Sequence, residues 1–172
     1  ADLQAEAGFT YSSSVLPGPS PLYGWPGLPR QPFRWSGGPI EFPCPMVRLG
    51  PIDLPYLGGT YLRLLPAAVR RIGLRRAAQN EALWAYCHPW EFDTDEAFHQ
   101  HDHIGTLASR IAWLGRSRMH RQLLRLLGEP VSPPLAEVAG GLIESELPLL
   151  HPNRPPELGP VGRWANGRLR QR

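Results

Sequence analysis

The pattern of apolar and polar residues predicts short helices and strands, separated by long loops, in the first half of the chain. Leu3 and Ala7 share one helical face and Gly8 is a suitable stop, so a helix is expected over residues 2–7. Apolar residues at near-alternating positions predict a short strand over residues 9–15 and another over residues 39–42. Between these strands we expect an ordered crossing, rich in proline and in the aromatic residues Tyr23, Trp25, Phe33 and Trp35.

The second half of the chain is predicted to be mainly helical. Gly58-Gly59 precedes a helix over residues 60–65, and Pro66 opens a second helix that runs towards residue 78. Residues 82–87 are short, apolar and aromatic, and are expected to be a buried strand. A helical period then predicts a long amphipathic helix or a helix pair, with apolar positions at Ile104, Leu107, Ile111, Leu114, Leu123, Leu124 and Leu127. A short helix is expected to begin at Ser132-Pro133 and to end at Gly140-Gly141.

Composition and charge indicate one folded domain followed by a basic tail. With 172 residues, 42% of them hydrophobic, the chain is long enough for one domain with a core. We expect that domain over residues 1–144, and we expect the Pro-, Gly- and Arg-rich residues 145–172 to be disordered. The net charge of +3 comes from this tail, and a near-neutral body argues against a nucleic-acid-binding domain. No apolar run approaches the ~18 residues of a membrane span, and the compartment stays open.

Chemistry is expected at the end of the predicted strand over residues 82–87. In folds of alternating strands and helices, ligands meet the carboxyl ends of strands, and here that end is His88-Pro89-Trp90-Glu91. An imidazole titrates near neutral pH, so His88 suits a role as a proton donor. The alternative is that His88 is structural, which is common for a lone histidine at a strand end.

Several other residues have side chains suited to chemistry or binding. His99, His101, Asp102 and His103 are of metal-ligating types, but neighbours on a short loop cannot all face one ion, so a solvated loop is expected. Gly58-Gly59 lacks the pattern of a phosphate-binding loop and is interpreted as close backbone packing.

Arginine and cysteine complete the candidates. Arg63, at a helix start, either meets a sugar or an anion or forms a structural ion pair. Cys44 and Cys87 are too few for a disulfide framework or a four-ligand zinc site, and both are expected to be free and buried. A pairing of Cys87 with His88 for nucleophilic catalysis is disfavoured, because adjacent strand residues point to opposite faces.

Three segments carry a more specific pattern: GFTYSSSV from Gly8 to Val15, LPYLGGTYLRLLP from Leu54 to Pro66, and WAYCHPWEFD from Trp84 to Asp93. In this order the chain resembles the polysaccharide deacetylases of the chitooligosaccharide-deacetylase (NodB-like) superfamily, carbohydrate esterase family 4. The similarity is greatest to the branch with a C-terminal extension, found beside exopolysaccharide and exosortase gene clusters. It covers residues 1–140, and the third segment is its most specific part.

The resemblance implies that this chain is the C-terminal portion of a distorted (β/α) barrel with added C-terminal helices. It implies a divalent metal, usually zinc, held by one Asp and two His, with a second Asp as base for the attacking water. Those residues belong to the first half of the family's domain, a half implied to be missing here, and no matching motif occurs in this chain, so no metal ligand is assigned.

By the same resemblance, His88 matches the family's general acid, which protonates the leaving amine. Tyr86 stands where the family has an apolar residue lining the pocket for the acetyl methyl group. Tyr86, Trp90 and Arg63 are therefore the candidate substrate-binding residues. Ser12 replaces the Asp that is usual in this branch, so no role of that carboxylate is carried over.

Two hypotheses follow. The first is an enzyme part: the C-terminal portion of a metal-dependent deacetylase acting on N-acetyl groups of a bacterial polysaccharide, inactive as this fragment alone. The second is a non-catalytic carbohydrate- or partner-binding module, or a gene remnant, which the exposed-looking aromatic residues Tyr23, Trp25, Phe33 and Trp35 favour.

Overall fold

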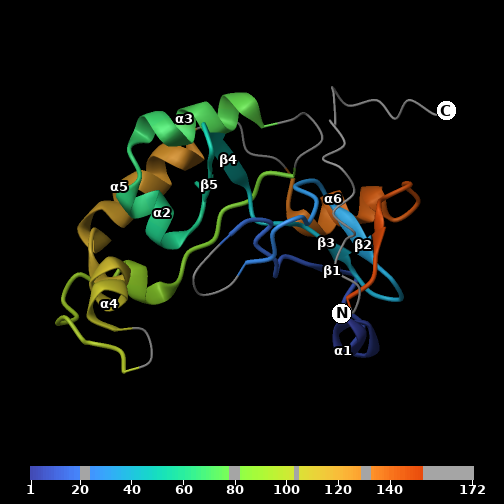
Figure 1. Cartoon of the computed structure of the whole chain (residues 1–172), viewed down its shortest axis with the longest axis horizontal. Coiled ribbons are helices and arrows are strands. Elements are labelled where there is room, and N and C mark those ends of the chain that lie inside the picture. Colours follow the sequence, from blue (N-terminus) through green and yellow to red (C-terminus); the bar gives the residue numbers. More distant parts are fainter. Residues whose placement is uncertain (20–23, 78–81, 103–104, 129–132, 153–172) are drawn as a thin grey trace.

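The computed structural model describes residues 1–19, 24–77, 82–102, 105–128 and 133–152. It has the expected mixed α/β class: a small mixed sheet lies at one end, and helices α2, α3, α4 and α5 gather at the other (Figure 1). The (β/α) barrel implied by the resemblance stays a prediction. Among the described residues, no helix has the length and apolar character needed to cross a membrane.

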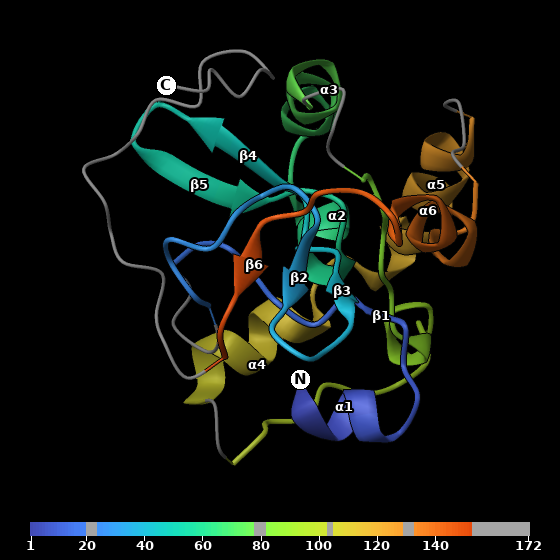
Figure 2. The same ribbon diagram turned by 90° about the vertical axis from the view of Figure 1, so that its right-hand side faces the viewer.

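The mixed sheet has the strand order β1-β3-β2-β6 (Figure 2). Strand β1 (Tyr11–Ser12) pairs in parallel with β3 (Ile40–Glu41), which pairs antiparallel with β2 (Phe33–Trp35). Helix α1 (Asp2–Glu6) precedes the sheet and ends before Gly8, whose φ of +79° favours glycine. The helix and the strands at β1 and β3 confirm the predictions for this region.

Strand β2 corrects the interpretation of the aromatic crossing. Phe33 and Trp35 are buried and pack edge to face with their ring centroids 4.8 Å apart, and Trp25 packs on them half-buried. These rings form core, because the sheet needs apolar side chains on its inner face. Tyr23 lies outside the described residues. The crossing therefore offers no exposed aromatic surface at Phe33 or Trp35.

The tail also differs from the expectation in the part that the structure describes. Strand β6 (Leu149–Leu150) pairs in parallel with β2, and Arg34 donates to the carbonyl of Ile143 at 2.9 Å. Order therefore continues past residue 144, because the free edge of β2 offers backbone partners that the local sequence does not reveal. Residues 153–172, with the five arginines of the tail, lie outside the described residues.

A hairpin that the sequence pattern did not reveal lies beside helix α3 (Figure 1). Strands β4 (Met46–Leu49) and β5 (Ile52–Pro55) pair antiparallel around a tight turn at Gly50, whose φ is +60°. Helices α2 (Gly59–Leu64) and α3 (Ala67–Arg76) follow, as predicted. Val47, Tyr56 and Leu57 form the core between the hairpin and these helices.

The predicted strand over residues 82–87 is wrong as a regular strand. The segment is extended, but its one ladder contact with the described residues is a parallel bridge between Gly58 and Tyr86. It is half-buried because Leu83 and Trp84 pack into different core clusters. A single bridge does not make a continuous ladder of backbone hydrogen bonds. The apolar residues of this segment therefore belong to a crossing between two core clusters and not to a buried strand.

The C-terminal helices agree with the predicted pair. Helices α4 (Gly105–Trp113) and α5 (Arg116–Leu127) are separated at Gly115, whose φ is +77°. Helix α6 (Leu135–Leu142) includes Gly140 and Gly141, so these glycines do not end the helix as expected. Ile104 and Ser132 lie outside the described residues.

Candidate functional site

Four rings follow one another along the extended segment that contains His88. The centroid distances are 5.6 Å from Trp84 to Tyr86, 6.1 Å from Tyr86 to His88 and 4.1 Å from His88 to Trp90. Trp84, Tyr86 and His88 alternate along an extended chain and so point to one side, and the short 3-10 helix that follows brings Trp90 onto His88. We call Trp84, Tyr86, His88 and Trp90 the aromatic row. It leads from the half-buried Trp84 to Trp90, which is 49% exposed, with His88 stacked on Trp90 at an interplanar angle of 6°.

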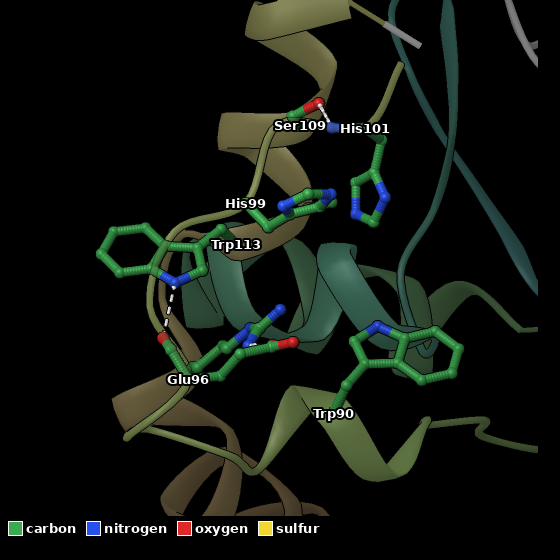
Figure 3. Close-up of a pocket in the computed structure, with 8 residues that line it drawn as sticks. Trp90, Glu96, His99, His101, Ser109 and Trp113 are labelled. Atoms are coloured by element: carbon green, nitrogen blue, oxygen red, sulfur yellow. Dashed lines mark hydrogen bonds and ion pairs between the residues drawn. The ribbon is translucent and has the colours of Figure 1, made fainter. Parts of the chain in front are cut away.

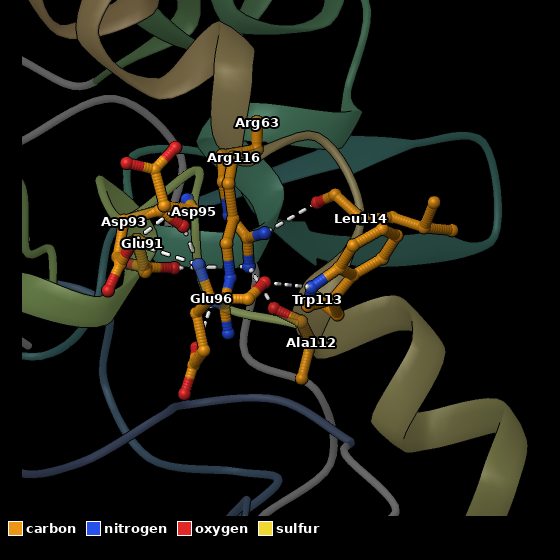
Figure 4. Close-up of polar contacts among 9 residues, drawn as sticks. All are labelled: Arg63, Glu91, Asp93, Asp95, Glu96, Ala112, Trp113, Leu114 and Arg116. Atoms are coloured by element: carbon orange, nitrogen blue, oxygen red, sulfur yellow. Dashed lines mark hydrogen bonds and ion pairs between the residues drawn. The ribbon is translucent and has the colours of Figure 1, made fainter. Parts of the chain in front are cut away.

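The buried carboxylate of Glu91 fixes the backbone at His88. Its Oε2 accepts the backbone N–H of His88 at 2.8 Å, and its Oε1 lies 3.2 Å from Nη2 of Arg63 (Figure 4). Residues Pro89–Glu91 form a short 3-10 helix, η1, closed by the N–H of Glu91 on the carbonyl of His88. The His88 imidazole is thus exposed, while the chain that carries it is anchored.

Arg63 is an interior residue, and its partners explain why. Its guanidinium donates to the carbonyls of Ala112 and Leu114 and to Oγ1 of Thr60, besides the ion pair with Glu91. Burial lowers the pKa of Arg63, and the charge of Glu91 opposes that shift. The sequence left a sugar contact and a structural ion pair open. With 1% of Arg63 exposed, the structure shows the ion pair, which ties α2 to η1, while the bonds to the carbonyls of Ala112 and Leu114 tie α2 to the end of α4.

Gly58-Gly59 confirms the interpretation as close backbone packing. A Cβ on Gly58 would lie 2.0 Å from the Tyr86 ring, and one on Gly59 would lie 2.7 Å from Oε1 of Glu91. The N–H of Gly59 also donates to the carbonyl of Tyr86 at 2.9 Å. The second and third resemblance segments therefore meet here, and the glycines leave the space in which the aromatic row and Glu91 sit.

A pocket of about 440 Å³ lies beside the outer end of the aromatic row (Figure 3). Its wall is made by the loop after η1 and by helices α4 and α5, through Trp90, Glu96, His99, His101, Ser109, Ala112, Trp113 and Arg116. Polar contacts tie the loop to the helices. Trp113 Nε1 donates to the Glu96 carbonyl at 3.2 Å, the N–H of His101 donates to Ser109 Oγ at 3.0 Å, and Arg116 pairs with the Glu96 carboxylate.

The histidine loop is exposed, in agreement with the solvated loop expected from the sequence, and it also borders this pocket. His99 and His101 are exposed, with their rings 5.5 Å apart, and both face this pocket. His103 lies outside the described residues. Among the residues that the structure describes, no group of three or more His, Cys, Asp or Glu side chains is placed to hold a metal ion.

The cysteines are free, but only one of them is buried as expected. Cys44 lies in the core with Leu16 and Met46, and burial raises the pKa of its thiol to about 11, while a hydrogen bond with Tyr86 opposes the shift. Cys87 is exposed, because it points away from the side of the segment that carries the aromatic row. Burial and the charge of Glu91 raise the pKa of Cys87.

A second buried carboxylate organises the first resemblance segment. Glu41 accepts the N–H groups of Ser14 at 2.5 Å and of Val15 at 3.1 Å, and the indole N–H of Trp35 at 3.1 Å. The Ser14 hydroxyl also donates to this carboxylate, and the Ser12 hydroxyl donates to the Ser14 hydroxyl at 3.0 Å. Ser12 thus belongs to a hydrogen-bonded network that holds β1 against β3.

Sequence reasoning missed the residues that build the pocket wall opposite Trp90. Trp113 and Arg116 were included only as part of a helical stretch, and Glu96 not at all. A helical period shows which positions are apolar, but it does not show which loop returns to cover them. The four acidic residues within residues 91–96 are the signal that could have indicated a charged partner.

Comparison with known proteins gives one match. Residues 13–139 match the family model described as a domain of unknown function (DUF3473). No curated protein and no solved structure matches the chain. The matched range contains all of the aromatic row, η1 and the pocket, and only the last three residues of the first resemblance segment.

Proposed function

Given that this chain belongs to the family of domains of unknown function DUF3473, we propose that it is the C-terminal part of a metal-dependent polysaccharide deacetylase, in which His88 is the general acid. The substrate class is an N-acetylated bacterial polysaccharide. The proposal extends the resemblance of the three segments, and the observation that carries it is the placement of His88. It is an exposed imidazole on an anchored backbone, within a row of rings that opens beside a pocket.

In this proposal His88 donates one proton to the nitrogen of the leaving amine. When the C–N bond of the acetamide breaks, the electron pair goes to the amine nitrogen, which takes the proton from the imidazolium of His88. Glu91 holds the His88 backbone, and Trp90 stacks on the ring. These two contacts restrict the conformations of the His88 side chain, so the imidazole is already oriented towards solvent. Trp90 and Tyr86 flank His88 in the row and are the proposed sugar contacts.

Metal chemistry would have to come from other residues. The described part of this chain offers no cluster of three or more ligating side chains, so it does not fit a catalytic zinc site. In the proposed enzyme, zinc, with its ligands and the base for water, belongs to the missing N-terminal half of the domain. We expect this chain alone to hydrolyse no N-acetyl sugar.

The test is His88→Ala in the full-length protein, assayed on an N-acetylated chitooligosaccharide and on an activated acetyl ester. Loss of a general acid costs roughly two to four orders of magnitude in rate, and the loss should fall on kcat for the amide. The ester should lose far less, because a good leaving group departs without a proton.

Zinc content of the variant is the control. Equal losses on both substrates with zinc absent would make His88 a ligand or scaffold residue. Near-normal turnover on the amide would remove His88 from the mechanism. His120→Ala is the matched variant, because His120 is an exposed histidine on α5 outside the pocket, and it should leave both activities unchanged.

The alternative of a non-catalytic binding module loses part of its basis. It depended on exposed aromatic residues in the crossing, of which Phe33 and Trp35 are core. Trp90, which is 49% exposed, lies beside His88 instead.

A further inference from the structure

We propose that the pocket beside Trp90 binds an uncharged sugar unit, an N-acetylhexosamine. This unit would belong to the same polysaccharide chain as the unit that is deacetylated at His88, and would be its neighbour. The choice of ligand rests on the proposed function, whereas the site rests on the pocket itself. The new contacts are Trp113, His99 and His101, which form the side of the pocket away from the aromatic row (Figure 3).

The size and the wall of the pocket fit a small ligand. Its volume of about 440 Å³ lies in the range of ligand sites, which is roughly 300–1,000 Å³. Trp90 and Trp113 bring two large ring systems to the wall, and His99 and His101 bring imidazoles that donate or accept hydrogen bonds. Aromatic surface for the C–H face of a ring, with polar groups for its hydroxyls, is what a sugar needs.

The charges of the pocket favour an uncharged ligand. The guanidinium of Arg116 lies on the wall, and it is already paired with the carboxylate of Glu96 (Figure 4). Its Nη1 also reaches the carbonyl of Asp93 at 3.4 Å. An anionic ligand would have to compete with Glu96 for Arg116, and an apolar ligand would cover this ion pair. A polyhydroxyl ring can hydrogen-bond to the pair without breaking it.

The wall is held in place before any ligand arrives. Trp113 is fixed by its hydrogen bond to the Glu96 carbonyl and by an edge-to-face contact with Phe98 at 5.9 Å. Ser109 is buried on α4; it accepts the N–H of His101 and donates to the Gly105 carbonyl at 2.8 Å, which fixes the loop at His101. A fixed wall lowers the entropy that binding would cost.

Trp90 connects the pocket to the reaction. One ring contributes to the pocket wall and stacks on His88 at 4.1 Å. A polymer that places one unit in the pocket therefore brings a neighbouring unit to His88. The pocket would select for chains of at least two units.

The test is titration of this chain with penta-N-acetylchitopentaose, followed by calorimetry and by the NMR signal of the Trp113 indole N–H. Trp113→Leu should weaken binding roughly three- to tenfold through the lost ring contact. His99→Ala, an exposed residue whose loss spares the fold, should weaken it roughly two- to tenfold. His120→Ala, which lies outside the pocket, should bind as the parent does.

The outcomes separate the pocket from the proposed function. Absence of binding at millimolar sugar, or equal affinity in the parent and in the His99→Ala and Trp113→Leu variants, overturns the pocket site. If binding falls in both variants but the full-length protein hydrolyses no N-acetyl group, the deacetylase proposal fails and the sugar site stands. If the full-length enzyme is active with an unchanged KM in both variants, the deacetylase stands and the pocket site fails.

Discussion

Two carboxylates of this chain are buried to nearly the same degree, but they are held by different chemistry. Glu41 is 0% exposed and is satisfied by neutral donors, the backbone and hydroxyl of Ser14, the backbone of Val15 and the indole of Trp35. Glu91 is 2% exposed and faces the guanidinium of Arg63 and one backbone N–H.

The difference separates a scaffold region from the candidate site. Around Glu41, the neutral donors come from β2 and from the segment that follows β1, so the carboxylate joins this segment to the sheet (Figure 2). Around Glu91, the charge pair links α2, η1 and the end of α4, and it lies under exposed rings. A buried charge pair is sensitive to loss of one partner, because the other charge is then left without compensation.

The largest effect is expected for Arg63→Met, which leaves Glu91 buried without its cation. We expect the free energy of unfolding to fall by about 3–5 kcal/mol, measured by chemical denaturation of this chain. Arg30→Met is the matched control, because the Arg30–Asp53 pair at 2.6 Å is partly exposed and should be worth about 0–1 kcal/mol.

A double variant sharpens this result. Arg63→Met together with Glu91→Met removes both charges, and most of the lost stability should return. If the single variant costs no more than Arg30→Met, the pair is not the anchor of the aromatic row, and the contrast with Glu41 disappears.

The second effect concerns Cys44, which lies between the two regions with Tyr86 against it. Its thiol has a pKa raised from 9.0 to about 11, so the unfolded chain loses this proton first as the pH rises. The contribution is therefore fully present below pH 9 and is lost between pH 9 and 11, by about 2–3 kcal/mol.

The measurement is the free energy of unfolding against pH in the presence of a reductant. Cys44→Ala should flatten the profile between pH 9 and 11, whereas Cys87→Ala, at the exposed cysteine, should keep most of it. An unchanged profile in the Cys44→Ala variant would assign the pH dependence to other groups.

The smallest effect is expected for Glu41→Gln. Glutamine keeps one acceptor oxygen but turns an amide N–H₂ towards donors of Ser14, Val15 or Trp35, so at least one hydrogen bond is lost. We expect a loss of roughly 1–3 kcal/mol, seen in thermal or chemical unfolding.

Glu144→Gln is the surface control for this substitution and should change stability by no more than about 0.5 kcal/mol. A loss at Glu41 as large as that of Arg63→Met would show that the charge itself, and not only its hydrogen bonds, is needed at this position.

The sequence by itself determined the elements whose signals are local. Helix α1 with its stop at Gly8, helices α2 and α3, and the division of α4 from α5 follow from apolar period and from glycine and proline positions. The close packing at Gly58-Gly59 and the placement of His88 at the end of an extended segment were also predictable from the sequence, whereas the residues that the glycines contact, Tyr86 and Glu91, were not.

Only the tertiary structure decided which distant residues meet. Nothing local brings β6 to the edge of β2, Arg63 to Glu91, or the loop after η1 to Trp113. The same apolar run that predicts a strand over residues 82–87 became a crossing between two cores, because its partners lie elsewhere in the chain. Period and composition describe what a segment can bury, whereas the contacts that build the candidate site depend on what the rest of the chain places against it.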